Sequence, residues 1–226
     1  FMGEKSEKRM NEKFFDLPRE KQDRMINGAL EVFAKNGFKH ASTDDMVKAV
    51  GVSKGLWFHY FGSKAGLYIF VYEYSVKYML LEISAVVDER ENDFFELARQ
   101  VELAKSRAGK NYPFMNVFLE ESARETEADV LAQTQESGRI LQEKIAGFLK
   151  NAEMKGVEDK ARRDKIKKMV DHTIKGIVKE QLYEGYDSEA AYKEIKECLD
   201  VLKEMIADST AAKEEEPISS SKPAAS

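Results

Sequence analysis

The sequence predicts an all-α protein, with an N-terminal three-helix helix-turn-helix head followed by a larger C-terminal helical bundle. Apolar residues recur at spacings of three and four along almost the whole chain, as they do in amphipathic helices. No alternating strand pattern of useful length is present in the sequence. Near the N-terminus two short helical segments meet at a glycine, which is typical of a helix-turn-helix motif.

Composition and charge divide the 226 residues into four segments. We expect an N-terminal extension over residues 1–18, a helix-turn-helix DNA-binding domain over 19–65, a helical ligand-binding and dimerisation domain over 66–208, and a disordered tail over 209–226. Residues 1–67 hold 12 Lys and Arg against 9 Asp and Glu, so this end is mildly basic within a chain of net charge −5. A basic end on an acidic body weakly favours binding of a polyanion.

Three helices are predicted in the head from their start and stop signals. The first follows Pro18 and ends at Asn36-Gly37, with an apolar stripe between them. The second begins at residues 42–45, where hydroxyl and carboxylate side chains match the free backbone donors of a first turn, and ends at Gly51. The third runs from Lys54 to Phe61.

The remaining helices are predicted by the same signals. Ser63 can cap a long fourth helix that leads out of the head to about residue 87. Apolar stripes then predict helices over 94–107, 114–124, 129–155, 166–182 and 188–207. The stripes of the last two are wide and regular, so we expect a homodimer in which two chains join through these helices.

Residues 43–61 place two short helices about a Gly-Val-Ser corner, and this is the layout of a helix-turn-helix motif. In such motifs the second helix lies in the major groove of DNA. Two helices this short cannot bury each other, so the preceding stripe from Met25 to Phe33 is expected to complete a small core.

The local sequence resembles the head of the tetracycline-repressor (TetR) family over roughly residues 19–70. Residues 41–47 read Ala-Ser-Thr-Asp-Asp-Met-Val, and residues 51–64 read Gly-Val-Ser-Lys-Gly-Leu-Trp-Phe-His-Tyr-Phe-Gly-Ser-Lys, followed by Leu67. The family pattern is Thr-x-x-x-(Ile/Leu)-Ala, Gly-Val-Ser-x-Gly-Thr-Leu-Tyr-x-(His/Tyr)-Phe, then Lys before Leu. The resemblance implies a homodimeric transcriptional regulator, a repressor or an activator, that binds a palindromic double-stranded DNA operator and an unknown small-molecule effector. Of the two roles we expect a ligand-responsive repressor.

Carried onto this chain, the motif gives a set of candidate DNA-contacting residues: Thr43, Lys54, Gly55, Leu56, Phe58, His59, Tyr60 and Lys64. Leu56 stands where Thr or Ser is frequent and Phe58 where Tyr is usual, so two hydroxyl groups of the family pattern are missing.

Each candidate has a chemical reason beside a plainer structural interpretation. The Thr43 hydroxyl can touch a phosphate or simply cap a helix. Lys54 starts the recognition helix, where it can reach bases or phosphate or remain a solvated lysine. Gly55 allows close approach of the backbone, and Lys64 suits a phosphate clamp. We expect Trp57 to lie in the core of the head.

His59 and Tyr60 are polar aromatic residues on the recognition helix, and outward projection would give them phosphate or base contacts. In the body, aromatic residues are frequent, and a few can line a pocket between helices. The candidate ligand-binding residues are Tyr78, Phe114, Phe118 and His172, for which ordinary core packing is the equally weighted alternative.

Catalysis has little support in the sequence. The 3 His residues are far apart, the single Cys198 lies at the edge of an apolar stripe, and neither a phosphate-binding loop nor a metal-binding motif occurs. We therefore predict no catalytic site, no metal and no cofactor. No apolar run approaches the ~18–20 residues that a membrane helix needs, and one cysteine fits a reducing compartment, so we predict a cytoplasmic protein without a membrane partner. A helical small-molecule-binding or scaffold protein without DNA-binding activity remains the alternative.

Overall fold

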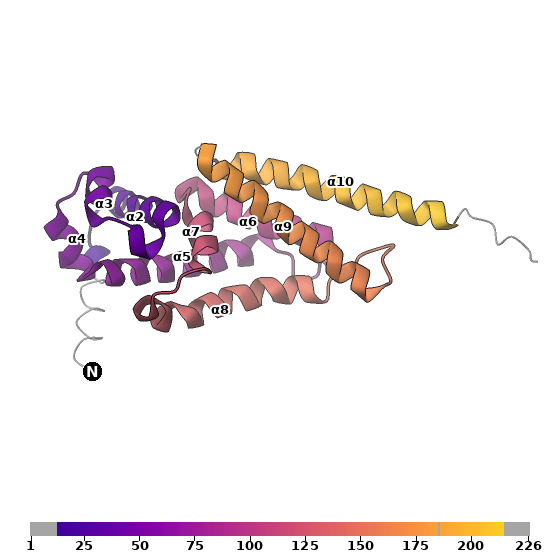
Figure 1. Ribbon diagram of the computed structural model, residues 1–226, viewed down its shortest axis with the longest axis horizontal. Helices are drawn as coiled ribbons and strands as arrows, with labels where there is room; N and C mark the ends of the chain where they lie inside the picture. The colour runs from indigo at the N-terminus through magenta and orange to yellow at the C-terminus, as the bar shows by residue number, and fades with distance from the viewer. Residues whose placement is uncertain (1–12, 185, 215–226) are drawn as a thin grey trace, which may run out of the picture.

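The computed structural model describes residues 13–184 and 186–214, and within these ranges the regular structure is helical. Labels follow Figure 1. The helices are α2 (Arg19–His40), α3 (Thr43–Val50), α4 (Lys54–Phe61), α5 (Lys64–Val86), α6 (Phe94–Asn111), α7 (Met115–Ser122), α8 (Ala128–Lys150), α9 (Lys160–Glu184) and α10 (Ser188–Glu214). The predicted all-α fold is confirmed.

Helices α2, α3 and α4 gather at one end of the molecule, which we call the head, and α6 to α10 form the body (Figure 1). Helix α5 starts in the head and runs into the body. It crosses the boundary predicted between residues 65 and 66 as one continuous helix. The head is therefore joined to the body by a helix and not by a flexible linker.

Serine caps fix where α3, α4 and α5 begin. The Ser42 hydroxyl accepts hydrogen bonds from the backbone N–H groups of Asp44 and Asp45, at 3.2 and 3.4 Å. Ser53 and Ser63 cap α4 and α5 in the same way. These bonds satisfy donors that a first helical turn leaves free, so the predicted starts are confirmed.

Glycines end α3 and α4 and interrupt α2 where the sequence predicted. Gly51 has φ 72° and ψ 28°, the left-handed conformation that favours glycine, and its N–H donates to the carbonyl of Val47. Gly37 has φ 64°, so the helical path of α2 is interrupted at the predicted Asn36-Gly37 end. The tight corner between α3 and α4 depends on the first of these conformations.

Phe14, which the sequence analysis assigned to an N-terminal extension, belongs to the core of the head. Its side chain is fully buried. Its ring lies against those of Tyr60, Phe61 and Phe70, with centroids 5.1 to 5.9 Å apart. The expectation of a separate extension over residues 1–18 is therefore wrong for this residue, because the fold brings it onto α4 and α5.

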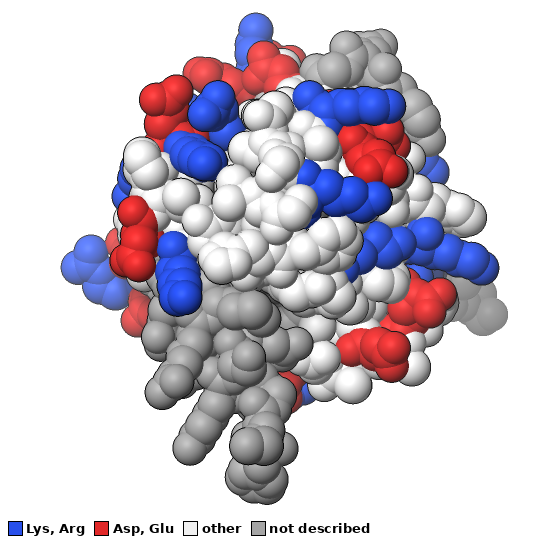
Figure 2. All heavy atoms as spheres, turned by 90° about the vertical axis from the view of Figure 1, so that its left-hand side faces the viewer, with Lys and Arg blue, Asp and Glu red and all other residues white. Residues whose placement is uncertain are grey.

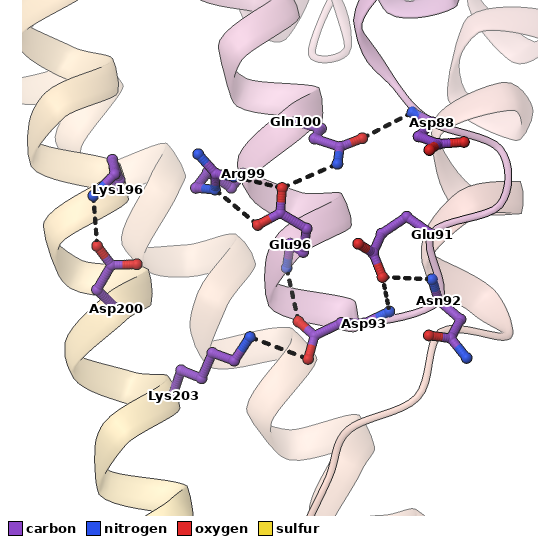
Figure 3. Close-up of polar contacts among 10 residues, drawn as sticks. All are labelled: Asp88, Glu91, Asn92, Asp93, Glu96, Arg99, Gln100, Lys196, Asp200 and Lys203. Atoms are coloured by element: carbon purple, nitrogen blue, oxygen red, sulfur yellow. Dashed lines mark hydrogen bonds and ion pairs between the residues drawn. The ribbon is translucent and has the colours of Figure 1, made fainter.

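Helix α6 is the centre of the body, and α10 lies along it. Figure 3 shows how the two are held at the start of α6. Asp93 caps α6 by accepting from the N–H of Glu96 at 2.9 Å, and its second oxygen lies 3.2 Å from Nζ of Lys203 on α10. Glu96 in turn pairs with Arg99 and accepts from Gln100. No helix of the described residues is long and apolar enough to cross a membrane.

Two predicted boundaries in the body are wrong. The helix predicted over 129–155 ends at Lys150, because the chain then leaves the helical path and pairs with the start of α6. The N–H of Glu153 donates to the carbonyl of Asn92, and the N–H of Phe94 donates to that of Glu153. The disordered tail predicted over 209–226 is also wrong in part, since α10 continues to Glu214. Residues 215–226 lie outside the described residues.

Helices α2 and α3 are in close contact at Gly28. A methyl group added there would meet Cγ2 of Val50 at 2.2 Å, so the glycine is needed for the contact. We expect Gly28→Ala to lower the free energy of unfolding by roughly 1–3 kcal/mol through overpacking. Combined with Val50→Ala, which removes the clashing methyl, the substitution should cost clearly less than the sum of the two single changes. Urea unfolding of all four proteins measures this coupling, and additive costs would refute the close contact.

Candidate nucleic-acid interface

Helix α4 separates into a buried and an exposed face, and the exposed face is the candidate DNA-reading surface. Trp57 and Phe61 point into the head, with 2% and 4% of their surface exposed, as predicted for Trp57. Gly55, Phe58 and His59 lie on the opposite, solvent-facing side. Phe58 is unusual among these because 40% of a large apolar side chain is in contact with solvent.

Lys54, at the first position of α4, is paired within the head. Its Nζ lies 2.9 Å from Oδ1 of Asp44 in α3, and both side chains are about half exposed or more. The hydrogen bond and the charge of Lys54 hold the pKa of Asp44 below its ordinary value, so the carboxylate remains ionised at neutral pH. The pair brings the starts of α3 and α4 together, and any phosphate bound by Lys54 must compete with Asp44.

Thr43 and Leu56 are each only partly exposed at the surface of the head. Ser42, and not Thr43, is the cap of α3, so the capping interpretation of Thr43 is wrong. Thr43 is half-exposed at the first position of that helix. Leu56 is also half-buried and packs against the core of the head, so only part of its side chain faces solvent.

Tyr60, one of the candidate DNA-contacting residues, lies on the buried side of α4. Only 8% of it is exposed, and its ring packs edge-on against the buried Phe14 at a centroid distance of 5.9 Å. It lies on the inward side of α4 because it follows Trp57 by three positions, which is nearly one helical turn. Its ring therefore packs α4 against the core of the head.

Lys64 is bound to the backbone of its own head. Its Nζ donates to the carbonyl oxygens of Phe38, Ala41 and Lys39 at 2.8, 3.3 and 3.4 Å. It also lies 4.5 Å from the centroid of the Phe38 ring, in cation–π geometry. These carbonyls belong to the last turn and the C-cap of α2, where the backbone lacks helical partners. The contacts give the ammonium an internal, structural role that the sequence analysis did not predict.

The end of the molecule that carries the head has an uncharged centre. Figure 2 faces this end and shows a continuous area of uncharged side chains with Lys and Arg on both sides of it, interspersed with Asp and Glu. A helix that enters a groove needs this distribution, because bases lie in the middle of the contact and phosphates at its edges.

Two hydrogen bonds join the head to the end of α7 and the segment after it. The Tyr68 hydroxyl of α5 donates to Oγ of Ser122 at 2.9 Å. The backbone N–H of Phe38 donates to Oε2 of Glu125 at 3.2 Å. The backbone of Phe38 thus accepts a hydrogen bond from Lys64 at its carbonyl and donates one to Glu125 from its amide. The loop that leaves α7 is consequently one point at which the body holds the head.

A second set of bonds joins α2 to the end of α6. The Tyr112 hydroxyl donates to Oδ1 of Asp23 at 2.6 Å. Burial and this bond raise the pKa of Tyr112 well above its ordinary value, so it remains a neutral donor. Nδ2 of Asn27 donates to the carbonyl of Asn111, whose own amide donates to the hydroxyl of Tyr78 at 2.9 Å. Tyr78 is therefore part of the junction between head and body.

A cavity of about 160 Å³ lies between α6, α8 and α9. Apolar residues form much of its wall, including Val101, Leu149 and Ile174. The Lys105 ammonium faces it with Glu102 at 2.8 Å. Burial disfavours the charged Lys105, but its carboxylate neighbours outweigh this and raise its pKa above the ordinary value. The cavity therefore combines an apolar wall with a buried ion pair.

The four residues predicted to bind a ligand do not line this cavity. Phe118 is buried among the rings of Phe33, Tyr68 and Tyr72, and so belongs to the core. Phe114 is half-buried under Lys35, and His172 is exposed on α9. Tyr78 lies at the head junction described above. Within the described residues there is also no group of three or more His, Cys, Asp or Glu that could hold a metal ion.

The geometry defines a helix-turn-helix protein with the recognition helix exposed at one end, and comparison with known proteins gives its family. Residues 25–69 match the family described as "Bacterial regulatory proteins, tetR family". The head therefore matches TetR-family regulators, and the resemblance found over residues 19–70 is confirmed.

Individual relatives are distant. The biofilm operon icaADBC HTH-type negative transcriptional regulators IcaR of Staphylococcus aureus strains Newman, COL and MW2 are each 23% identical over 145 residues, covering 59% of this chain and 72% of theirs. The crystal structure of the TetR-family regulator PfmR from Thermus thermophilus is 17% identical with a TM-score of 0.44, covering 78% of this chain and 97% of that one.

The internal contacts of Lys64 lead to a stability prediction. We expect Lys64→Met, which keeps the apolar stem, to lower the free energy of unfolding by about 1.5 kcal/mol, because it removes charged hydrogen bonds from otherwise free carbonyls. Lys39→Met, at an exposed neighbouring position, should change the stability by less than about 0.5 kcal/mol. Urea unfolding measures both. A Lys64→Met protein of unchanged stability whose DNA binding loses salt dependence would instead make Lys64 a phosphate clamp.

Proposed function

We propose that this protein is a ligand-responsive repressor that binds a two-fold symmetric operator as a homodimer. The observation that carries the DNA-binding part is the exposed face of α4, which lies at the end of the molecule where an uncharged area is bordered by Lys and Arg interspersed with Asp and Glu (Figure 2). An outward helix of this kind can enter a major groove while its neighbours reach the phosphates. The name of the IcaR relatives, negative transcriptional regulators, supports a repressor over an activator.

A homodimer through α9 and α10 is supported by the apolar residues that these helices expose. Met169, Val201 and Met205 are 57%, 54% and 62% exposed in the single chain. Val201 and Met205 are four positions apart, and so share one face of α10. Burial of such side chains against a second copy would stabilise a dimer. Ile177 and Leu199, the regular positions of the same stripes, are already buried within one chain and cannot form this interface.

The effector-binding part of the proposal is supported by the cavity between α6, α8 and α9. Its apolar wall and buried ion pair suit a small molecule with an apolar body and a polar group. Glu120, near the end of α7, also lines it, and α7 ends at Ser122, which holds Tyr68. A molecule that moves α7 would therefore act on a helix bonded directly to the head.

Selection of duplexes from a random DNA pool by the purified protein tests the DNA-binding function. We expect enrichment of an inverted repeat whose half-sites are about one helical turn, roughly 10 bp, apart. Fluorescence anisotropy should then show binding that weakens steeply with salt, because phosphate contacts release counterions. Recovery of no preferred sequence would favour the alternative, a helical small-molecule-binding protein without DNA-binding activity.

The Asp44–Lys54 pair predicts a variant with stronger DNA binding. Asp44→Asn should tighten binding to all duplexes and steepen the slope of log affinity against log salt by roughly 1, since Lys54 becomes free to contact a phosphate. Asp45→Asn is the matched control, because it removes the adjacent exposed carboxylate and leaves the pair intact. Anisotropy titrations at several salt concentrations measure both slopes. Equal slopes for the two variants would show that Lys54 does not move from Asp44 to the DNA.

A further inference from the structure

Phe58 presents an apolar surface at the centre of the exposed face of α4. It is 40% exposed, although burial of a large aromatic side chain is strongly favourable. Gly55 lies one turn before it on the same side, and a methyl group built at Gly55 would meet nothing within 4 Å. The ring therefore stands beside open space in which another surface can reach it.

The polar candidates near Phe58 are mostly engaged elsewhere. Lys54 is paired with Asp44 at 2.9 Å, and Lys64 is held by three backbone carbonyls. Tyr60 is buried below α4. Of the outward side chains in the middle of α4, Phe58 and His59 remain, and Phe58 is the apolar one. Hydrogen-bonded reading of bases by this part of the helix is consequently sparse.

A phenyl ring can discriminate between base pairs in one way in the major groove. It neither donates nor accepts a conventional hydrogen bond, so the donor and acceptor pattern of the bases gives it no information. Thymine alone carries an apolar group there, the C5-methyl, and aromatic side chains contact this group favourably. The chemistry of the side chain thus selects the base it can recognise.

We propose that Phe58 is a specificity-determining residue that selects a thymine in each operator half-site by contact with its C5-methyl group. The inference rests on the proposed DNA-binding function. It assigns a role to a position where the hydroxyl of the family pattern is missing: the ring reads a methyl group in place of a polar contact.

The experiment removes only the methyl group from the DNA. In the duplex selected from the random pool, each thymine of a half-site is replaced in turn by deoxyuridine, which keeps the hydrogen-bonding edge. We expect one position at which replacement weakens binding of the unmodified protein about fourfold per half-site, the value for burial of one methyl-sized group. Replacement at the other thymines should have a smaller effect.

Variants at Phe58 assign that effect to the ring. Phe58→Ala should bind thymine and deoxyuridine duplexes equally at the sensitive position, whereas Phe58→Tyr, which retains the ring, should keep the difference. Leu81→Ala is the matched control, because Leu81 is an exposed apolar residue in the body, 71% exposed on α5. It should show the full methyl effect.

The outcomes separate this inference from the function on which it rests. A protein that selects no sequence refutes both. A protein that selects an operator but binds every deoxyuridine duplex as well as the thymine duplex refutes the methyl contact alone. A methyl effect that persists unchanged in Phe58→Ala also refutes it, because another residue would then read the thymine. Loss of the effect in Phe58→Ala with retention in Phe58→Tyr supports it.

Discussion

The structure depends on α5 serving as a packing partner for both head and body. Leu67 and Val71 near its start and Met79 and Ile83 further along it are all buried, and the helix packs against α2 and α4 of the head and against α6 and α8 of the body. Protein interiors pack as densely as crystals, so a helix buried along its length cannot shift at one end independently of the other. The orientation of α4 is therefore set by the body, through α5, as well as by the rest of the head.

Aromatic side chains hold the N-terminal part of α5 rigidly against the neighbouring helices. The ring of Phe70 lies 4.9 Å from that of Phe61 at the end of α4 and 5.1 Å from that of Phe14. Tyr68 packs edge-on between Phe33 of α2 and Phe118 of α7. Such pairs contribute beyond the area they bury, and their preferred edge-on geometry fixes relative orientation. Two groups of rings thus fix α5, one against the recognition helix and the other between α2 and the body.

The sequence was sufficient to predict what local chemistry determines. The serine caps of α3, α4 and α5 and the glycine stops of α3 and α4 act within a few residues of their own positions, so the motif could be placed from residues 42–63. The inward position of Trp57 followed from helical period alone. The fold class followed from the same periodicity, because apolar stripes at helical spacing have few other structural explanations.

Long-range contacts set the limits of that prediction. Phe14 is separated from its partners by more than 45 residues, and nothing beside it in the sequence indicates burial. Lys64 sits where a phosphate contact is plausible, and only the folded chain shows the carbonyls of Phe38 and Ala41 around it. The predicted ligand residues failed to converge because aromatic content does not distinguish a core from a pocket. Tertiary geometry decides all of these assignments.

The hydrogen bonds across the head junction are few and individually weak, and this bears on regulation. Tyr68–Ser122, Phe38–Glu125 and Tyr112–Asp23 all end at the C-terminal end of α6, on α7 or on the loop after α7. A typical hydrogen bond contributes about 1 kcal/mol to stability, so the set is worth a few kcal/mol. A ligand shifts a two-state equilibrium only by its difference in affinity for the two states, and a difference of this size is within reach of a small molecule. Helix α7 borders the cavity and is also hydrogen-bonded to the head. An effector in the cavity and DNA on the head would therefore oppose each other if they favoured different positions of α7.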